Sequence, residues 1–454
     1  MLASVEALVL EQLDSVHRRD VLGHPRGTAL ADELLAARPG AQPGDIEVAV
    51  STVRALLDTG VDNAAGGELA FIPGSGLFSA ALGELIASVA NRYTGLAGLT
   101  PAAVALEQGV LSWLTELFGL PSRAQGLLLS GGSNANLTAL VTAREKLAPD
   151  GVDAACVYVG RHAHASVRKA ARIAGIRPGH VRVVDTDEGQ RLDPEAVRVA
   201  VKQDLADGLR PVAIVGAAGT TNTGAIDPLH RLADVAADLG LWFHVDAAYG
   251  GFFQLTARGR RRLAGIERAD SITLDPHKSL FLPYGLGALL VRDRADLARA
   301  FAEDADYLRD HDDDGALPDF GSISPELTRE WRGLKLWLPL QLHGTDAFTT
   351  ALDRALDLAN HAHDALATDP HLELGPRPDL SIITFRVHGD DAVQDALLEA
   401  VNGDGHVHLS STRLDGRVAI RLAVLSHRTT RATVDRAVEL IRASARDLVG
   451  ARGS

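Results

Sequence analysis

The chain has 454 residues and a formal net charge of −14, with 46% hydrophobic and 23% charged residues. A chain of this length exceeds one simple core, so we expect two or three packed units of an ordinary soluble globular protein. No block of Lys and Arg stands out that could neutralise a run of phosphates, which excludes nucleic acid as an expected partner.

The single cysteine, Cys156, excludes an intramolecular disulfide and any zinc site that needs several thiolates. It lies in an apolar run and is predicted to be a small buried hydrophobe rather than a nucleophile. Residues 1–20 predict an amphipathic helix without the apolar core of a signal peptide, and no apolar run has the length of a membrane span. The sequence therefore predicts a cytoplasmic protein with no bound metal and no membrane partner.

Residues 1–75 predict a helical N-terminal segment that ends in a loop containing Gly and Pro. Helical periodicity continues to Ser88 and returns from Pro101 to Phe118. From Gln125 short apolar runs alternate with longer amphipathic segments, which indicates a mostly parallel sheet with crossover helices. The predicted strands are 126–129, 154–159, 180–184, 211–215, 241–245, 271–274 and 288–291. We assign residues 76–345 to this large α/β domain.

The rest of the chain predicts a small α+β domain over residues 346–454. Before it, residues 304–321 are polar and acidic, a composition typical of a functional loop at this length. A long helix is expected from Pro325 to about Ala367. Strands at 380–387 and 418–424 and helices at 391–401 and 431–449 complete the expected elements.

Ligands of a parallel sheet bind beyond the carboxyl ends of its strands, so the residues after each strand are the candidates for chemistry. After the first strand, Gly132 and Ser133 open a helix, where backbone N–H groups and a hydroxyl can hold one phosphate; a plain tight turn is the alternative. A histidine of the turn 160–166 can stack on a planar ligand or transfer protons, although a surface histidine is the commoner case. The Gly/Thr turn 216–224 leaves room for a ligand or is an ordinary turn.

Two further strand ends carry charge. Asp246 closes an apolar strand, where a carboxylate is costly to bury unless it meets a cation; helix capping is the alternative. Lys278 follows the next strand in the run Asp275-Pro276-His277-Lys278 and is either an amine for Schiff-base chemistry or a surface lysine. A phosphate turn, a ring-facing histidine, an acid and an amine match the phosphate, ring, ring nitrogen and aldehyde of pyridoxal phosphate (PLP). The sequence therefore predicts a PLP enzyme in which Lys278 carries the cofactor.

These motifs resemble the group II PLP-dependent amino-acid decarboxylases, the family of the aromatic-L-amino-acid and glutamate decarboxylases. The likeness extends from about Phe71 to the C-terminus and is strongest in residues 244–251 and 275–278. It implies the PLP-dependent transferase fold of type I, pyridoxal 5'-phosphate as the cofactor, and a homodimer with active sites at the subunit interface.

The resemblance also implies a role for each matching residue. Lys278 would hold the cofactor and move protons, and His277 would lie beside the phosphate and the reacting centre. Asp246 would keep the pyridine nitrogen protonated, with Ala248 against one face of the ring and His164 stacked on the other. The further implied contacts are Gly132 and Ser133 with the phosphate, Thr221 with Asp246 and the cofactor, and Phe71, Pro73, Phe320 and Arg421 with the substrate. Arg421 could equally be a structural arginine.

Phe320 departs from the family pattern. The family's mobile loop usually carries a Tyr that protonates the substrate carbon after CO₂ leaves, and a count without gaps back from residues 331–337 places Phe320 there. A phenyl ring has no proton to donate. In plant relatives, Phe at this position accompanies aldehyde synthases, in which O₂ is used and the amine is lost. Tyr307 or His311 could supply the proton instead, because the loop differs in length.

The sequence thus predicts decarboxylation of an L-amino acid to its amine and CO₂. The alternative is oxidative decarboxylation and deamination to an aldehyde, and its only support is the missing proton donor. A non-catalytic PLP-binding protein is disfavoured, because Lys278, Asp246 and His164 are all present. Aromatic, acidic and diamino substrates all remain open.

Overall fold

The computed structural model describes residues 1–23, 27–303 and 317–450 of the chain. Its contacts divide the chain into two units. Unit 1 comprises Met1–Ser75, Asp357–Arg377 and Ser381–Ser454, and unit 2 comprises Gly76–Leu356 and Pro378–Leu380. The contacts therefore group the N-terminal segment with the C-terminal part of the chain, and they place the second boundary after residue 356 rather than after 345.

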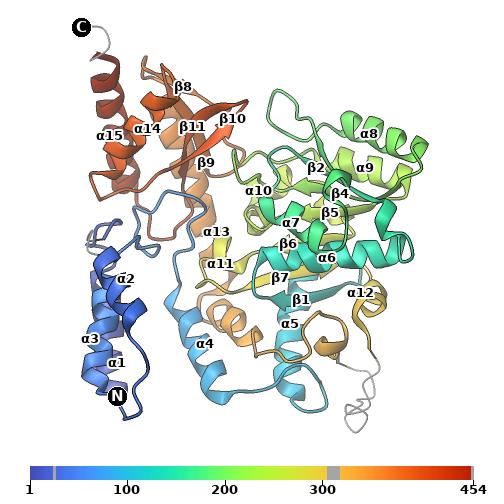
Figure 1. Cartoon of the computed structure of the whole chain (residues 1–454), viewed down its shortest axis with the longest axis horizontal. Coiled ribbons are helices and arrows are strands. Elements are labelled where there is room, and N and C mark those ends of the chain that lie inside the picture. The colour runs from blue at the N-terminus through green and yellow to red at the C-terminus, as the bar shows by residue number, and fades with distance from the viewer. Residues whose placement is uncertain (24–26, 304–316, 451–454) are drawn as a thin grey trace. The chain divides into compact units, whose positions relative to one another are not determined.

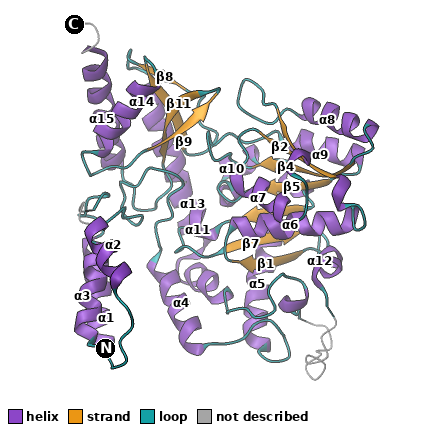
Figure 2. Ribbon diagram, viewed as in Figure 1, coloured by secondary structure: helices purple, strands orange, loops and turns teal. Residues whose placement is uncertain are grey.

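A seven-stranded sheet forms the centre of unit 2, in the order β1-β7-β6-β5-β4-β2-β3 (Figures 1 and 2). The strands from β6 through β5, β4 and β2 to β3 are parallel, whereas β7 runs antiparallel to both β6 and β1. This mostly parallel sheet confirms the predicted α/β class. Its strands are β1 (Gln125–Leu129), β2 (Ala155–Gly160), β3 (Val181–Val184), β4 (Arg210–Ala217), β5 (Trp242–Asp246), β6 (Ser271–Leu274) and β7 (Gly287–Val291).

Some helices of unit 2 begin or end at residues that satisfy the free backbone groups of a helix terminus. Asp193, for example, caps α8 by accepting a hydrogen bond from the N–H of Glu195, and Pro194 follows at the first helical position. Gly240 ends α9 in the left-handed region, at φ 67°. The helices are α4 (Phe78–Ala90), α5 (Pro101–Leu117), α6 (Gly132–Leu147), α7 (Ala165–Ile173), α8 (Pro194–Ala206), α9 (Leu229–Leu239), α10 (Ala257–Arg262), α11 (Pro276–Ser279) and α12 (Arg294–Phe301).

The long helix α13 covers Gly333–Leu366, so the predicted start at Pro325 is wrong. Residues 325–332 pack against α5 and β1 and do not form a helix. Arg329 donates to the buried carboxylate of Glu107 and to the carbonyl of Leu128, and Glu107 also accepts the N–H of Gly333 (3.1 Å). This carboxylate therefore anchors the preceding segment and binds a free N–H at the helix start. Gly344, at φ 67° and ψ 166°, interrupts α13 with a kink.

Unit 1 contains an antiparallel four-stranded sheet, in the order β10-β11-β9-β8. Two of these strands follow the prediction, and the other two were not predicted. The strands are β8 (Leu372–Leu374), β9 (Ile382–Val387), β10 (Ser410–Leu414) and β11 (Arg417–Ala423), and the helices are α1 (Leu2–Ser15), α2 (Gly27–Ala36), α3 (Ile46–Leu57), α14 (Asp391–Asn402) and α15 (Arg431–Gly450).

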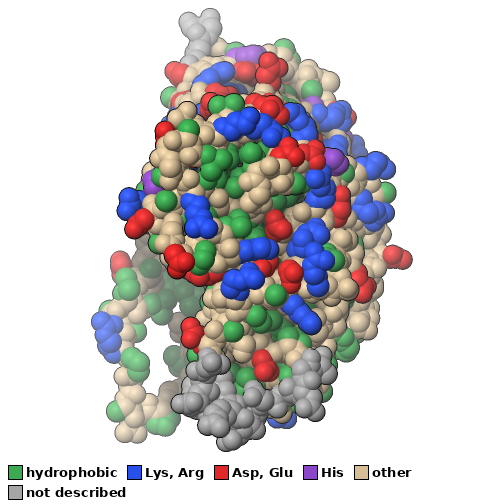
Figure 3. All heavy atoms as spheres, turned by 90° about the vertical axis from the view of Figure 1, so that its right-hand side faces the viewer, with side chains coloured by type: hydrophobic (Ala, Val, Ile, Leu, Met, Phe, Trp, Pro, Cys, Tyr) green, Lys and Arg blue, Asp and Glu red, His purple; other side chains and the backbone are tan. Residues whose placement is uncertain are grey.

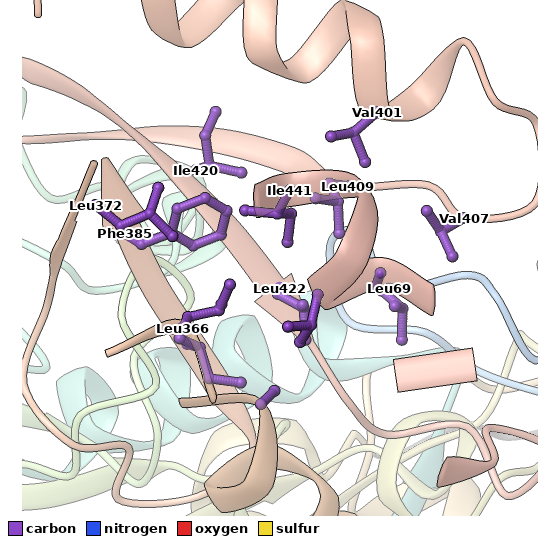
Figure 4. Packing of buried hydrophobic residues seen from close by; sticks show 14 of the residues in the cluster. Leu69, Leu366, Leu372, Phe385, Val401, Val407, Leu409, Ile420, Leu422 and Ile441 are labelled. Carbon is purple, nitrogen blue, oxygen red and sulfur yellow. The ribbon is translucent and has the colours of Figure 1, made fainter. Parts of the chain in front are cut away.

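The core of unit 1 joins the two ends of the sequence. Figure 4 shows Leu69 among the buried side chains of Phe385, Ile420 and Ile441. The N–H of Leu69 donates to the carbonyl of His408, and the N–H of Ala423 donates to the carbonyl of Leu69. Backbone pairing and apolar burial thus hold the N-terminal segment to the C-terminal sheet.

Among the described residues, no helix is long and apolar enough to cross a membrane. Lys, Arg, Asp and Glu side chains are interspersed on the face that Figure 3 shows. The predicted cytoplasmic location stays a prediction from the sequence.

Candidate functional site

The candidate site lies at the carboxyl ends of β5 and β6. Asp246 is the last residue of β5 and pairs in register with Thr273 of the parallel strand β6. Asp275 follows β6 directly, and Lys278 lies in the short helix α11. Because parallel strands end at the same edge of a sheet, the acid and the lysine predicted from the sequence reach the same edge.

Lys278 is held by Asp275. The Nζ atom of Lys278 lies 2.8 Å from Oδ2 of Asp275, and Nε2 of His277 lies 3.7 Å from the same oxygen. His277 donates its Nδ1–H to the carbonyl of Leu286 (2.6 Å), and burial lowers the pKa of its imidazole. Asp275 is 2% exposed, and its Oδ1 atom has no hydrogen-bond partner among the residues that the structure describes.

The start of α6 lies against this acid and lysine pair. A Cβ atom at Gly132 would lie 2.8 Å from Oδ2 of Asp275 and 3.2 Å from Cβ of Ala248, and one at Gly131 would lie 3.4 Å from Cε1 of His277. Only glycine allows so close an approach at position 132. The structure therefore brings the predicted phosphate turn together with Ala248 and His277.

Asp246 is buried, at 9% exposure, and other groups hold its two oxygens. Oδ2 accepts a hydrogen bond from Nδ2 of Asn136 (3.0 Å), and Oδ1 accepts one from the N–H of Ala248 (3.2 Å). Such donors stabilise a carboxylate that burial would otherwise disfavour.

His244 lies beside Asn136 at the centre of the unit. Its Nε2 lies 3.0 Å from Oδ1 of Asn136, and its Nδ1 lies 2.8 Å from Oγ of Ser271, which also accepts the indole N–H of Trp242. The ring is 0% exposed. Burial lowers the pKa of His244 to about 4, although the charge of Asp246 opposes the shift, so His244 is neutral near pH 7.

His164 precedes α7 and caps it. Its Nδ1 accepts from the N–H of Ser166 (3.2 Å) and lies 2.7 Å from Oγ of the same residue. Burial lowers the pKa of His164, the positive charge of Lys278 lowers it further, and Asp246 and Asp275 oppose the shift. These electrostatic effects indicate that the predicted histidine, acid and lysine lie near one another.

Thr221 lies in the turn that follows β4. This turn adjoins Asp246, because the N–H of Ala218 donates to the backbone carbonyl of Asp246 (2.9 Å). The hydroxyls of Thr220 and Thr223 lie 2.8 Å apart within the turn. The location of Thr221 is compatible with its predicted role, which stays a prediction.

Three predicted substrate residues belong to unit 1. Arg421 on β11 is 3% exposed and donates to Oγ of Ser410 (2.9 Å) and to the carbonyl of Phe71 (3.1 Å). The Phe71 backbone has φ 48°, and its side chain is 64% exposed. Pro73 follows two residues later and is buried. Arg421 thus supports the backbone of Phe71, a structural role that the sequence left open.

Phe320, the fourth predicted substrate residue, is 0% exposed. The guanidinium carbon of Arg329 lies 4.6 Å from the centre of its ring. No hydrogen bond, ion pair or ring contact among the described residues links Phe320 to Lys278 or Asp246. This packing indicates a core position for the phenyl ring. Tyr307 and His311 lie outside the described residues.

Three residues of the site were missed from the sequence: Asn136, Ser166 and Asp275. Asn136 follows Gly132 by one helical turn, so it shares the face of α6 that starts at the phosphate turn. Ser166 is two residues from His164, and Asp275 is three residues from Lys278. These three residues could have been found from their short distance in sequence to a predicted site residue together with their burial. Burial, however, cannot be read from one sequence.

The residues present fit PLP. Among the described residues, the N–H groups of Gly132 and Ser133 and the Ser133 hydroxyl have no hydrogen-bond partner, which leaves an anion-binding helix start available for the phosphate. Lys278 supplies an amine, and Asp246 a buried acceptor for a protonated ring nitrogen.

Comparisons with known proteins agree with this geometry. The model of the pyridoxal-dependent decarboxylase conserved domain matches residues 35–388. Aromatic-L-amino-acid decarboxylase of Bacillus atrophaeus is 35% identical over 80% of this chain and 77% of its own, and L-2,4-diaminobutyrate decarboxylase of Rhizobium meliloti is 38% identical over 80% and 75%. Phenylacetaldehyde synthase of Arabidopsis thaliana is 30% identical over 89% and 86%. The structure of Oryza sativa TDC with PLP and tryptamine matches with a TM-score of 0.93 and 29% identity, over 98% and 97% of the two chains.

His244 should make stability depend on pH. Its pKa in the folded protein, about 4, lies below the value of about 6.5 in an unfolded chain, so the unfolded state binds the proton first as pH falls. We expect this contribution to stability to be complete above about pH 6.5 and to be lost progressively toward about pH 4, by about 3 kcal/mol in total.

The measurement is urea unfolding of the native chain and of His244→Gln at about pH 7 and about pH 4.5. The native chain should lose more unfolding free energy between these two values than the variant does. An equal loss in both proteins would show that His244 does not carry the effect, whatever other groups titrate in that range.

Proposed function

This chain belongs to the pyridoxal-dependent decarboxylase family, with PLP as its cofactor, and on that premise we propose that it converts an L-amino acid to the corresponding amine and CO₂. The observation that carries the proposal is the convergence of Asp246, Lys278 and the α6 start at one edge of the sheet. When bound, PLP supplies a ring that accepts the electrons of the breaking bond to the carboxylate.

The chain's own residues bind and orient the reactants. Lys278 would supply the amine that holds the cofactor. Oδ2 of Asp275 lies 2.8 Å from Nζ of Lys278, so Asp275 can accept a proton from that nitrogen. With PLP bound, Asp246 would stabilise positive charge on the ring nitrogen, and the N–H groups of Gly132 and Ser133 would hold the phosphate. His164, neutral because of its lowered pKa, can pack on a ring without repelling that charge.

The oxidative alternative also has relatives, since an aldehyde synthase is among the similar proteins. Within this sequence, the only support for the oxidative reaction was Phe320 at the position of the usual Tyr. The Phe320 ring is buried against Arg329, which favours a packing role for that residue. Simple decarboxylation is therefore the proposal, and consumption of O₂ is the observation that separates the two reactions.

Purified protein should release CO₂ and the amine from at least one L-amino acid in a panel of aromatic, acidic and diamino substrates, without O₂ uptake. Lys278→Ala should remove both this activity and the visible absorption of lysine-bound PLP, because no other amine replaces Nζ. Product mass spectrometry and an oxygen electrode provide the readouts, and Lys202→Ala, at an exposed lysine of α8, is the matched control.

Aldehyde, ammonia and peroxide with O₂ uptake would establish the alternative reaction. Bound cofactor with no turnover of any substrate would establish a non-catalytic PLP-binding protein.

A pocket of about 480 Å³ beside His164 bears on the substrate class. Ser133, His164 and Ser166 line it together with three cationic side chains of α7: Arg168, Lys169 and Arg172. These three cations have no ion-pair partner among the described residues, and no carboxylate lines the pocket. An acidic side chain would be attracted there and a second ammonium repelled, so we propose an amino acid with an anionic side chain.

Within the same panel, acidic substrates should therefore have the highest kcat/KM. Arg168→Ala should raise KM for such a substrate by roughly 3- to 10-fold with kcat nearly unchanged, because it removes an interaction formed equally in the ground state and the transition state. Steady-state kinetics measure this, with Arg198→Ala on α8 as the control. A preference for diamino or aromatic substrates, or an unchanged KM, contradicts the assignment.

We also propose that two copies of the chain form a homodimer, as the family resemblance implies. On α4 of unit 2, exposed apolar side chains recur at helical spacing: Phe78, Leu82, Leu85, Ile86 and Val89. The last three are 57%, 51% and 79% exposed. An apolar stripe of this kind is costly in water, and a second copy of the same stripe would cover it.

Light scattering should give a mass of twice 47.9 kDa for the native chain. The double variant Ile86→Asp with Val89→Asp should give a single-chain mass, because charge at the centre of an apolar contact is strongly unfavourable. Leu205→Asp, at an exposed apolar residue of α8 (53%), should stay a dimer. A native monomer, or a double variant that remains a dimer, contradicts this interface.

A further inference from the structure

We propose that Asn136 is a positioning residue that holds Asp246 in place for the cofactor and joins it to His164. Its side chain contacts three polar groups of the site: Oδ2 of Asp246, Nε2 of His244 and Oγ of Ser166, each at 3.0 Å. Asn136 is 1% exposed, so water cannot replace these partners. The inference deepens the proposed function by naming a residue that acts through Asp246 without touching the reactants.

The orientation of the Asn136 amide follows from its partners. A carboxylate only accepts hydrogen bonds, so the atom of Asn136 that faces Asp246 is the NH₂ group. The same nitrogen donates its second proton to Ser166. The carbonyl oxygen of Asn136 must then face His244, which fixes a proton on Nε2 of His244.

The rest of the network follows from that proton. His244 is neutral near pH 7, so its Nδ1 is an acceptor and takes the hydroxyl proton of Ser271. On the other side, Ser166 accepts from Asn136 and can donate its own proton to Nδ1 of His164, which also accepts the N–H of Ser166. His164 in its neutral form therefore carries its proton on Nε2.

Asn136 thus connects two groups that the family resemblance places at different parts of one ring. Asp246 would meet the ring nitrogen, and His164 would cover a face. Because a donor to Asp246 Oδ2 fixes that oxygen, the carboxylate cannot rotate freely, and its Oδ1 is fixed by Ala248. Loss of the Asn136 donor should weaken this orientation more than loss of packing volume alone.

The decisive variant is Asn136→Leu, which keeps a side chain of similar size but has no donor toward Asp246 and adds no charge. We expect the dissociation constant of PLP, titrated into the apo protein, to rise by roughly 10- to 100-fold, the change for one lost hydrogen bond to a charged group. With PLP labelled with ¹⁵N in its ring, the native complex should keep the ring nitrogen protonated across neutral pH, and the variant should lose that proton as pH rises.

Two further variants separate a positioning role from a general structural one. Thr138→Val alters a buried hydroxyl on the same helix that donates only to the Asn134 carbonyl, and it should leave both readouts unchanged. Ser166→Ala removes only the branch toward His164, so it should shift the ¹⁵N resonances of the His164 ring while the ring nitrogen of PLP stays protonated.

The native apo protein provides a test that needs no variant to fold. Histidine ¹⁵N spectra near pH 7 should show His244 and His164 with the proton on Nε2 and not on Nδ1. A proton on Nδ1 of His244, or native-like PLP affinity in Asn136→Leu, overturns the proposal. These readouts concern cofactor binding and protonation, so they remain decisive even if no amino acid is decarboxylated, which would refute the proposed function instead.

Discussion

A carboxylate buried at the end of a parallel strand is the constraint around which this site is organised. Asp246 is 9% exposed, and burial of an acid without donors or a cation costs several kcal/mol. The chain meets this cost with the Asn136 amide and the Ala248 N–H. Those two donors come from α6 and from the turn after β5. Both can reach Asp246 only if α6 packs on the sheet in one fixed position and orientation.

The same constraint explains why small residues surround the acid. Gly132 allows the start of α6 to approach Asp275 and Ala248, and a Cβ atom at Gly250 would lie 2.1 Å from the carbonyl of Ala218 in the turn after β4. Side chains at these positions would push apart the segments that supply the donors. The close approach of these turns therefore both leaves space for a planar ligand and brings the donors to the carboxylate.

The central sheet could be predicted because its strands are buried apolar runs separated by amphipathic helices, a pattern that local sequence carries. The strands β8 and β10 were missed because one has three residues and the other alternates Ser, Thr and Arg with few apolar residues. The start of α13 was misplaced because residues 325–332 follow a buried ion pair to Glu107, and such long-range pairing leaves no periodic signal.

Part of the site could be predicted for a similar reason. Lys278 and His164 follow strands and Asp246 ends one, so strand order and chemistry identify them together. Asn136 lies inside a helix, where a polar residue is ordinarily assigned to the solvent face, and only the fold shows that it faces Asp246 and His244. The sequence placed Phe320 by counting from a distant motif, whereas its environment depends on Arg329 and could be described only in three dimensions.

Helix α6 also fixes the distance between two parts of the site. Its first residue, Gly132, belongs to the expected phosphate turn, and Asn136, four residues later, supports the acid expected at the ring nitrogen. A rise of about 1.5 Å per residue places these positions about 6 Å apart along the helix axis. Because a single rigid turn carries both, the separation between the phosphate turn and the residue that supports Asp246 is built into the protein. Molecules that share the ring but differ in the length of the phosphate arm would satisfy one end and miss the other.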